Sequence, residues 1–136
     1  MSTLQLISAG SDNSGKPQIT EAEVQAMQRA VINLFERWKL TESEAATLLG
    51  GINARTYHRW KKGEYGRTSV DLNARLSNLM GIHKALRLLF KDALRGYEWI
   101  RKPNSHFAGR SALDVLLNGE FTDLMRVRHY LDAMRG

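Results

Sequence analysis

The basic side chains of this 136-residue chain gather in two short segments, a spacing that suits the binding of a polyanion. Residues 53–67 contain five basic side chains and one acidic side chain, and residues 82–102 contain six and two. Together these segments carry more positive charge than the net charge of +6 of the whole chain. Nucleic acid is therefore one candidate partner, and two ordinary solvated helix faces are the alternative.

Catalytic chemistry has little support in the residue types. The chain has no cysteine, so it has no disulfide framework, thiol nucleophile or cysteine-based zinc site, and we expect a reducing compartment. Carboxylate pairs such as Asp92 with Glu98 have spacings that are routine on helix surfaces. Four histidines are scattered without the spacing of metal ligands: His58, His83, His106 and His129. The sequence predicts no enzyme, no metal site and no cofactor.

The hydrophobic residues are too dispersed for a membrane protein. No apolar stretch approaches the roughly 20 residues that cross a bilayer. The first residues lack a basic start followed by an apolar block, so they do not predict a secretory signal. We expect a cytoplasmic protein, with residues 1–19 as a flexible N-terminal tail because they are polar and rich in glycine.

The elements that must position the first basic segment are helices. Two capping boxes, Thr20-x-x-Glu23 and Thr41-x-x-Glu44, each predict the start of a helix. Apolar residues at helical spacing follow both of them. A third short helix is predicted over 54–62 and ends before a glycine.

The second half of the chain has the same helical periodicity. From Ser69 the apolar pattern continues to the Lys102-Pro103 pair, and Gly81 either breaks it into two helices or weakens one long helix. A short helix is predicted to start at 111–114, and a last one covers about 120–134. No segment alternates as a strand does, so the predicted fold is all-α.

Residues 41–62 have the pattern of a helix-turn-helix. This motif needs a small residue where its two helices cross and a glycine in the turn, and Ala45 or Ala46 and Gly50-Gly51 meet these needs. The buried side of the second helix would consist of Ile52, Tyr57 and Trp60.

The same spacing predicts which side chains face DNA. Arginine can bind a guanine edge with two hydrogen bonds, so Arg55 near the start of the second helix is the best candidate for reading a base. Lys61 and Lys62 suit backbone phosphates. The predicted DNA-binding residues are Asn53, Arg55, Thr56, His58, Arg59, Lys61 and Lys62.

Two blocks of the sequence resemble the Xre/MbcA/ParS-type antitoxins of bacterial type II toxin–antitoxin pairs. The first is Ala45–Gly50 followed by Arg55–Gly63, which is similar to the helix-turn-helix of that family. The second resembles its C-terminal toxin-binding domain and consists of Leu89-Phe90, Trp99–Asn104, Phe107–Ser111, Leu113–Leu117 and a closing helix with Val127 and Leu131. The resemblance implies an N-terminal helix-turn-helix domain over 20–80 and a small helical toxin-binding domain over 81–136.

The resemblance also implies a function. The protein would be a homodimeric antitoxin that binds its own double-stranded operator DNA and neutralises a RES-domain toxin. Toxins of that group consume NAD, and the antitoxin would cover the active site, with Arg135 entering an anionic, phosphate-accepting cleft. The implied toxin-binding residues are Trp99, Arg101, Asn104, Phe107, Arg110, Arg128, Arg135 and Gly136.

Two other functions compete with this one. A helix-turn-helix transcription regulator without a toxin partner would keep the DNA-binding segment and use the second domain for dimerisation or another ligand. A small helical hydrolase or transferase is the third possibility, and an assay of NAD consumption by the protein alone would test it.

Overall fold

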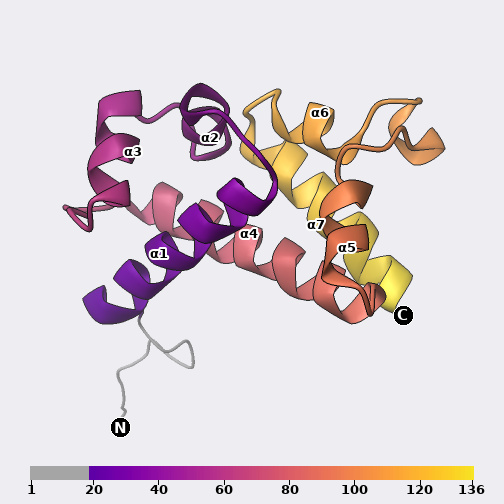
Figure 1. Cartoon of the computed structure of the whole chain (residues 1–136), viewed down its shortest axis with the longest axis horizontal. Coiled ribbons are helices and arrows are strands. Elements are labelled where there is room, and N and C mark those ends of the chain that lie inside the picture. Colours follow the sequence, from indigo (N-terminus) through magenta and orange to yellow (C-terminus); the bar gives the residue numbers. More distant parts are fainter. Residues whose placement is uncertain (1–18) are drawn as a thin grey trace, which may run out of the picture.

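In a computed structural model of the chain, the described residues are 19–136, and they fold into helices (Figure 1). The prediction of an all-α fold is confirmed, since no strand occurs in this range. The predicted flexible tail lies outside the described residues except for Ile19. The elements are α1 (Glu21–Arg37), α2 (Glu42–Leu48), α3 (Ala54–Lys61), α4 (Val70–Leu89), α5 (Ala93–Trp99), the 3₁₀ turn η2 (Ser105–Phe107), α6 (Ala112–Leu116) and α7 (Phe121–Arg135).

The predicted capping boxes start the first two helices. The Thr20 hydroxyl accepts a hydrogen bond from the backbone N–H of Glu23 at 3.1 Å, and the Glu23 carboxylate accepts from the backbone N–H of Thr20 at 2.9 Å. Thr41 and Glu44 repeat this arrangement at the start of α2. Each box satisfies two backbone donors that a helix start would otherwise leave without partners.

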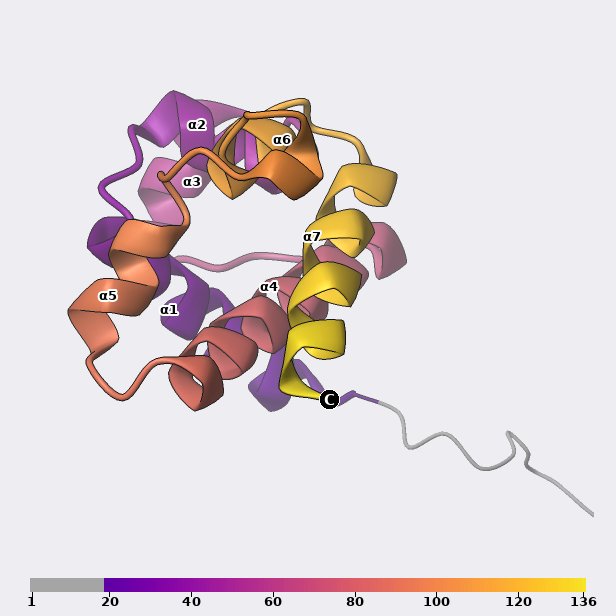
Figure 2. The same ribbon diagram turned by 90° about the vertical axis from the view of Figure 1, so that its right-hand side faces the viewer.

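The long helix α4 is the central element of the fold (Figure 1). It packs against α1, α5 and α7, and Figure 2 shows α7 lying beside it. Gly81 does not break α4, which decides between the two predicted alternatives.

The helical pattern is interrupted at residues 90–92 instead, so the expectation of a continuous apolar face up to Pro103 is wrong there. Phe90 is extended, and the Asp92 carboxylate caps α5 by accepting from the backbone N–H of Leu94 at 3.0 Å. This cap starts a new helix, α5, which runs in a different direction from α4 (Figure 2).

The C-terminal helices are held by short polar connections. Pro103 and Ser111 form an isolated antiparallel bridge that closes the loop around η2. The predicted helix start at 111–114 is confirmed: Ser111 and Asp114 form a capping box at the start of α6, and α6 packs against α7. The last helix ends at Arg135, one residue beyond the predicted end.

The core is continuous from the first helices to the last one. On the N-terminal side it contains an aromatic cluster of Phe35, Trp38, Tyr57 and Trp60, whose neighbouring ring centroids lie 5.9–6.3 Å apart. On the C-terminal side, residues of α4, α6 and α7 such as Ile82, Val115 and Val127 are fully buried. Within residues 19–136, no helix is long and apolar enough to span a bilayer.

Candidate nucleic-acid interface and C-terminal surface

Helices α2 and α3 pack together around a turn that the paired glycines make possible. Gly50 and Gly51 have φ angles of 89° and 82°, a left-handed conformation that residues with a Cβ adopt only with strain. Ala45 and Ala46 of α2 are both buried, as expected for the small residues at the crossing of the helices. The turn therefore takes residues 49–53 and directs α3 across α2.

The inner face of α3 is apolar, as its spacing predicts. Tyr57 and Trp60 are only 3% and 2% exposed, Tyr57 packs on Phe35 and Trp60 packs on Tyr57, whereas Ile52 in the turn is half-buried. Burial raises the pKa of the Tyr57 hydroxyl, so this ring remains neutral in the core. These contacts leave the opposite face of α3 to solvent.

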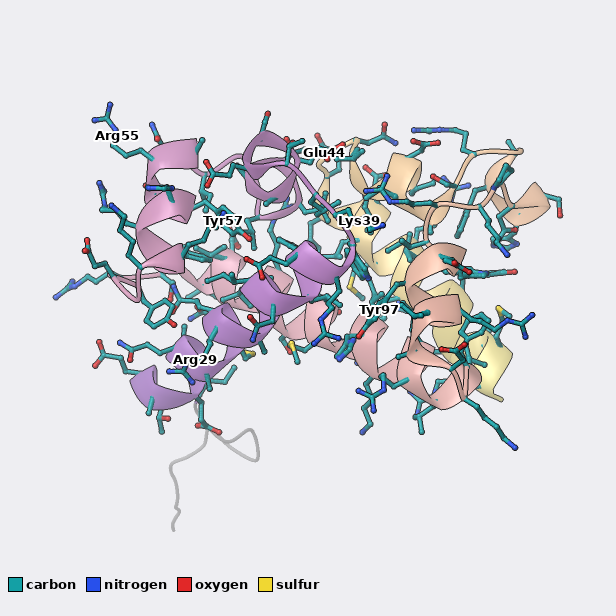
Figure 3. The ribbon with its side chains drawn as sticks, in the orientation of Figure 1. Arg29, Lys39, Glu44, Arg55, Tyr57 and Tyr97 are labelled. Atoms are coloured by element: carbon teal, nitrogen blue, oxygen red, sulfur yellow. The ribbon has the colours of Figure 1, made fainter. Side chains whose placement is uncertain are left out.

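Three cations on that outer face are exposed and have no side-chain partner among the described residues. They are Arg55, Arg59 and Lys62. Figure 3 shows Arg55 extending from the start of α3 into solvent, away from the rest of the molecule. Such unneutralised side chains keep their full charge and donor capacity for an external anion.

The other predicted DNA-binding residues have internal contacts. The Asn53 carboxamide oxygen caps α3 by accepting from the backbone N–H of Arg55 at 2.7 Å. His58 Nδ1 and Lys61 Nζ each lie 3.2 Å from the same Glu42 carboxylate oxygen. Hydrogen bonds from His58 and then Lys61 lower the pKa of Glu42, so this carboxylate neutralises part of the α3 face. Thr56 is half-buried.

The residues implied for toxin binding divide into exposed and internal ones. Phe107 is internal, because its side chain is only 1% exposed and packs edge-to-face on Tyr130. Trp99 is half-buried and stacks on Tyr130 with ring centroids 6.2 Å apart. Both aromatic rings therefore support the C-terminal surface by packing on Tyr130. Phe107 exposes almost no surface area that a partner could contact.

Several polar members of the same set make structural hydrogen bonds. The Arg101 guanidinium donates to the backbone carbonyl of Trp38 at 2.6 Å, which ties the end of α5 to the end of α1. Asn104 caps η2 by accepting from the backbone N–H of His106 at 2.9 Å. Arg110 donates to the backbone carbonyl of Asp114 at 2.8 Å. These side chains maintain the surface even where they are exposed.

The end of α7 contains a row of charged side chains. Arg128 donates to Asn78 Oδ1 of α4 at 2.8 Å, and its Nε lies 3.5 Å from the Asp132 carboxylate. The same carboxylate lies 3.4 Å from Arg135. Arg135 and Gly136 are exposed, so the end of the chain is accessible while Asp132 orients its last arginine.

Sequence reasoning missed three residues that position these surfaces. Asp132 lies four residues after Arg128, a helical spacing that predicts an ion pair. Glu42 had no such signal, since it meets α3 across 16 and 19 residues. Arg75 donates to the backbone carbonyls of Leu48 and Gly119, which join α2 to the loop before α7.

These features define a class of protein: a helical protein with a basic helix-turn-helix in its first half and a second helical unit packed on the same central helix. Comparison with known protein families gives the particular family. Residues 17–81 match the antitoxin Xre-like helix-turn-helix domain, and residues 85–136 match the antitoxin Xre/MbcA/ParS C-terminal toxin-binding domain. The chain belongs to the Xre/MbcA/ParS-type antitoxins.

The chain is also similar to a protein of Sinorhizobium fredii (strain NBRC 101917 / NGR234), the uncharacterized protein y4oB. The two are 42% identical over 120 residues, which is 88% of this chain and 92% of that protein. The family gives the general function: an antitoxin of a toxin–antitoxin pair, with one domain that binds DNA and one that binds the toxin.

Proposed function

We propose that this antitoxin represses its own operator as a homodimer and neutralises a RES-domain toxin that consumes NAD, by covering the toxin's active site. The observation that carries the proposal is the separation of two exposed surfaces. The free cations of α3 lie at one end of the molecule, and the end of α7 lies near the other (Figure 1). Both partners could therefore be bound at once, which autoregulation by an antitoxin–toxin complex requires.

DNA recognition would start from the first turn of α3. Arg55 would enter the major groove and bind a guanine edge, while Arg59 and Lys62 would contact phosphates. A homodimer would place two copies of α3 on two half-sites separated by about one helical turn. Because the antitoxin acts on DNA, we place it in the cytoplasm.

The test is operator binding by Arg55→Ala, measured by fluorescence anisotropy at fixed salt. We expect a loss of about 1–3 kcal/mol, which is roughly 5- to 150-fold in Kd. The matched control is Arg95→Ala, which removes the same charge from exposed α5, far from α3 (Figure 1). Equal affinities of the two variants would show that the recognition face has been misplaced.

Toxin neutralisation would depend on the exposed end of α7. Arg135 makes only a 3.4 Å contact with Asp132, and both side chains are partly exposed. Surface pairs of this kind contribute about 0–1 kcal/mol, so Arg135 could exchange this partner for an anionic group of the toxin at small cost. A guanidinium in the cofactor cleft would donate hydrogen bonds to that anionic group, and its volume would exclude NAD.

Co-expression with the protein encoded by the neighbouring gene tests that step. Wild-type antitoxin should restore growth and the cellular NAD level and should co-purify with the toxin. Deletion of Met134–Gly136 should lower the NAD level again and leave operator binding unchanged. Full protection by the truncated chain would refute the role of the C-terminal end, and absence of any complex would favour the stand-alone regulator. The antitoxin alone should consume no NAD.

A further inference from the structure

A small pocket of about 250 Å³ lies where α1, α4 and α5 meet. Its polar lining comes from all three helices: Asn33 and Arg37 of α1, His83 and Arg87 of α4, and Tyr97 of α5. Figure 3 shows Tyr97 on the side of α5 that faces the end of α1, well away from Arg55. The pocket is therefore distinct from the proposed DNA interface.

The positive charge in this pocket is not compensated. No acidic residue lines it, and neither Arg37 nor Arg87 forms an ion pair with any of residues 19–136. The polar contact of the Arg37 guanidinium is with the Tyr97 hydroxyl at 3.5 Å, and its Cζ lies 5.9 Å from the centre of that ring. Two guanidinium groups beside one hollow favour an anion there.

His83 has the electrostatic environment expected of such a site. Burial lowers its pKa, and the nearby charges of Arg87 and Arg37 lower it further. Its ring is therefore neutral near pH 7, with one N–H donor and one acceptor nitrogen. Its Nδ1 atom is buried and has no hydrogen-bond partner within the described part of the chain.

We propose that this pocket binds the phosphoryl group of a small ligand, either free phosphate or the phosphate of a mononucleotide. The two guanidinium groups would each offer a pair of parallel N–H donors, the geometry that suits phosphate oxygens. The Asn33 amide and the Tyr97 hydroxyl supply further neutral donors. The proposal does not depend on the identity of the toxin or the operator.

The ligand would act on both matched domains. Arg37 lies in the segment that matches the helix-turn-helix domain, while Arg87 and Tyr97 lie in the segment that matches the toxin-binding domain. An anion held by residues of both segments would bridge them. Binding to the folded state alone would also raise the melting temperature, by an amount that grows with the logarithm of the ligand concentration above Kd.

The experiment uses the full chain and two probes, inorganic phosphate and AMP, each titrated at constant ionic strength against chloride. The His83 ring resonances in NMR report the site directly. We expect a saturable shift of these resonances with 1:1 stoichiometry and a higher His83 pKa in the complex, since a bound anion favours the imidazolium. Tighter binding of inorganic phosphate would identify free phosphate as the source, and tighter binding of AMP would identify a nucleotide.

Arg87→Gln and Arg37→Gln should each weaken probe binding by at least about tenfold, because each removes a charge-assisted contact. Arg95→Gln is the matched control with the same change of charge on α5, and it should bind as the wild type does. Melting curves show which variants fold, and either pocket variant is sufficient for the test. A response that does not saturate, or one that Arg95→Gln weakens equally, would overturn the proposal.

Discussion

Replacement of Gly81 by alanine tests the contact between α4 and α7. In an exposed helix interior this change stabilises a protein by about 1 kcal/mol, because alanine has the better helix propensity. Here a Cβ atom at Gly81 would lie 2.5 Å from Cζ of Arg128 and 2.7 Å from its Nε. These separations are far below van der Waals contact, so the guanidinium would have to move.

The cost of that movement follows from the present contacts of Arg128. Its Nη1 donates to Asn78 Oδ1 at 2.8 Å, and Asn78 is only 9% exposed. A hydrogen bond to a charged group contributes about 1.5–3 kcal/mol, and its loss would leave a buried acceptor without a donor. The exposed ion pair with Asp132 adds little. The lost hydrogen bond lowers the free energy of unfolding by about 2 kcal/mol, and the helix propensity of alanine raises it by about 1 kcal/mol. The net destabilisation is therefore about 1 kcal/mol.

Urea denaturation followed by tryptophan fluorescence measures this difference, since Trp38 and Trp60 are buried reporters. The decisive comparison is a double-mutant cycle with Arg128→Ala. In that background the three atoms closest to the new methyl group are removed, and Gly81→Ala should raise the free energy of unfolding by about 1 kcal/mol. If Gly81→Ala raises the free energy of unfolding in the wild-type background, Arg128 does not obstruct the methyl group. If it lowers the free energy of unfolding equally in both backgrounds, a contact other than the one with Arg128 is responsible.

Two further substitutions test the other polar links. Arg101→Ala should lower the free energy of unfolding by about 2 kcal/mol in urea denaturation, because it removes a charged donor from the Trp38 carbonyl. Glu42→Gln should tighten operator binding and steepen its dependence on salt by about one counterion, because it releases Lys61. In an NMR titration Glu42 should lose its proton below its ordinary pKa, and His58→Ala should raise that pKa. The stabilisation from this carboxylate is therefore present above its ordinary pKa and disappears as the pH falls through the lowered value.

The helix starts could be predicted because their chemistry is local. A capping box needs only two residues three positions apart, and the boxes predicted at Thr20 and Thr41 both form. The interruption after Leu89 was missed because the apolar pattern continues across it. The sequence indicated Gly81 as a possible helix breaker. In the structure Gly81 is helical, and its lack of a side chain leaves room for Arg128 of α7. That role depends on tertiary packing, which helical periodicity does not contain.

The buried side of α3 could be predicted because it follows from local helical spacing. The ion pairs that its outer side chains form could not be predicted in this way. The spacing of Tyr57 and Trp60 places both on the inner side. The pairing of Lys61 with Glu42 depends on how α2 crosses α3. The partners of Arg75 and Arg101 are harder still to predict from sequence, because they are backbone carbonyls. Every residue has a backbone carbonyl, so no sequence pattern indicates which one accepts.

Because several arginines have internal contacts, the net charge of the chain overstates the number of cations that are free to bind an external anion. Five guanidinium groups bond to a carbonyl, amide or carboxylate oxygen within the described chain, namely those of Arg75, Arg101, Arg110, Arg128 and Arg135. Removal of the first four would affect packing before it affected an external anion. The cations that remain free on α3 are close together, and attraction between charges falls steeply beyond the Debye length of about 8 Å at physiological salt. Affinity for DNA should therefore follow the few free charges of α3 and not the total charge of the chain.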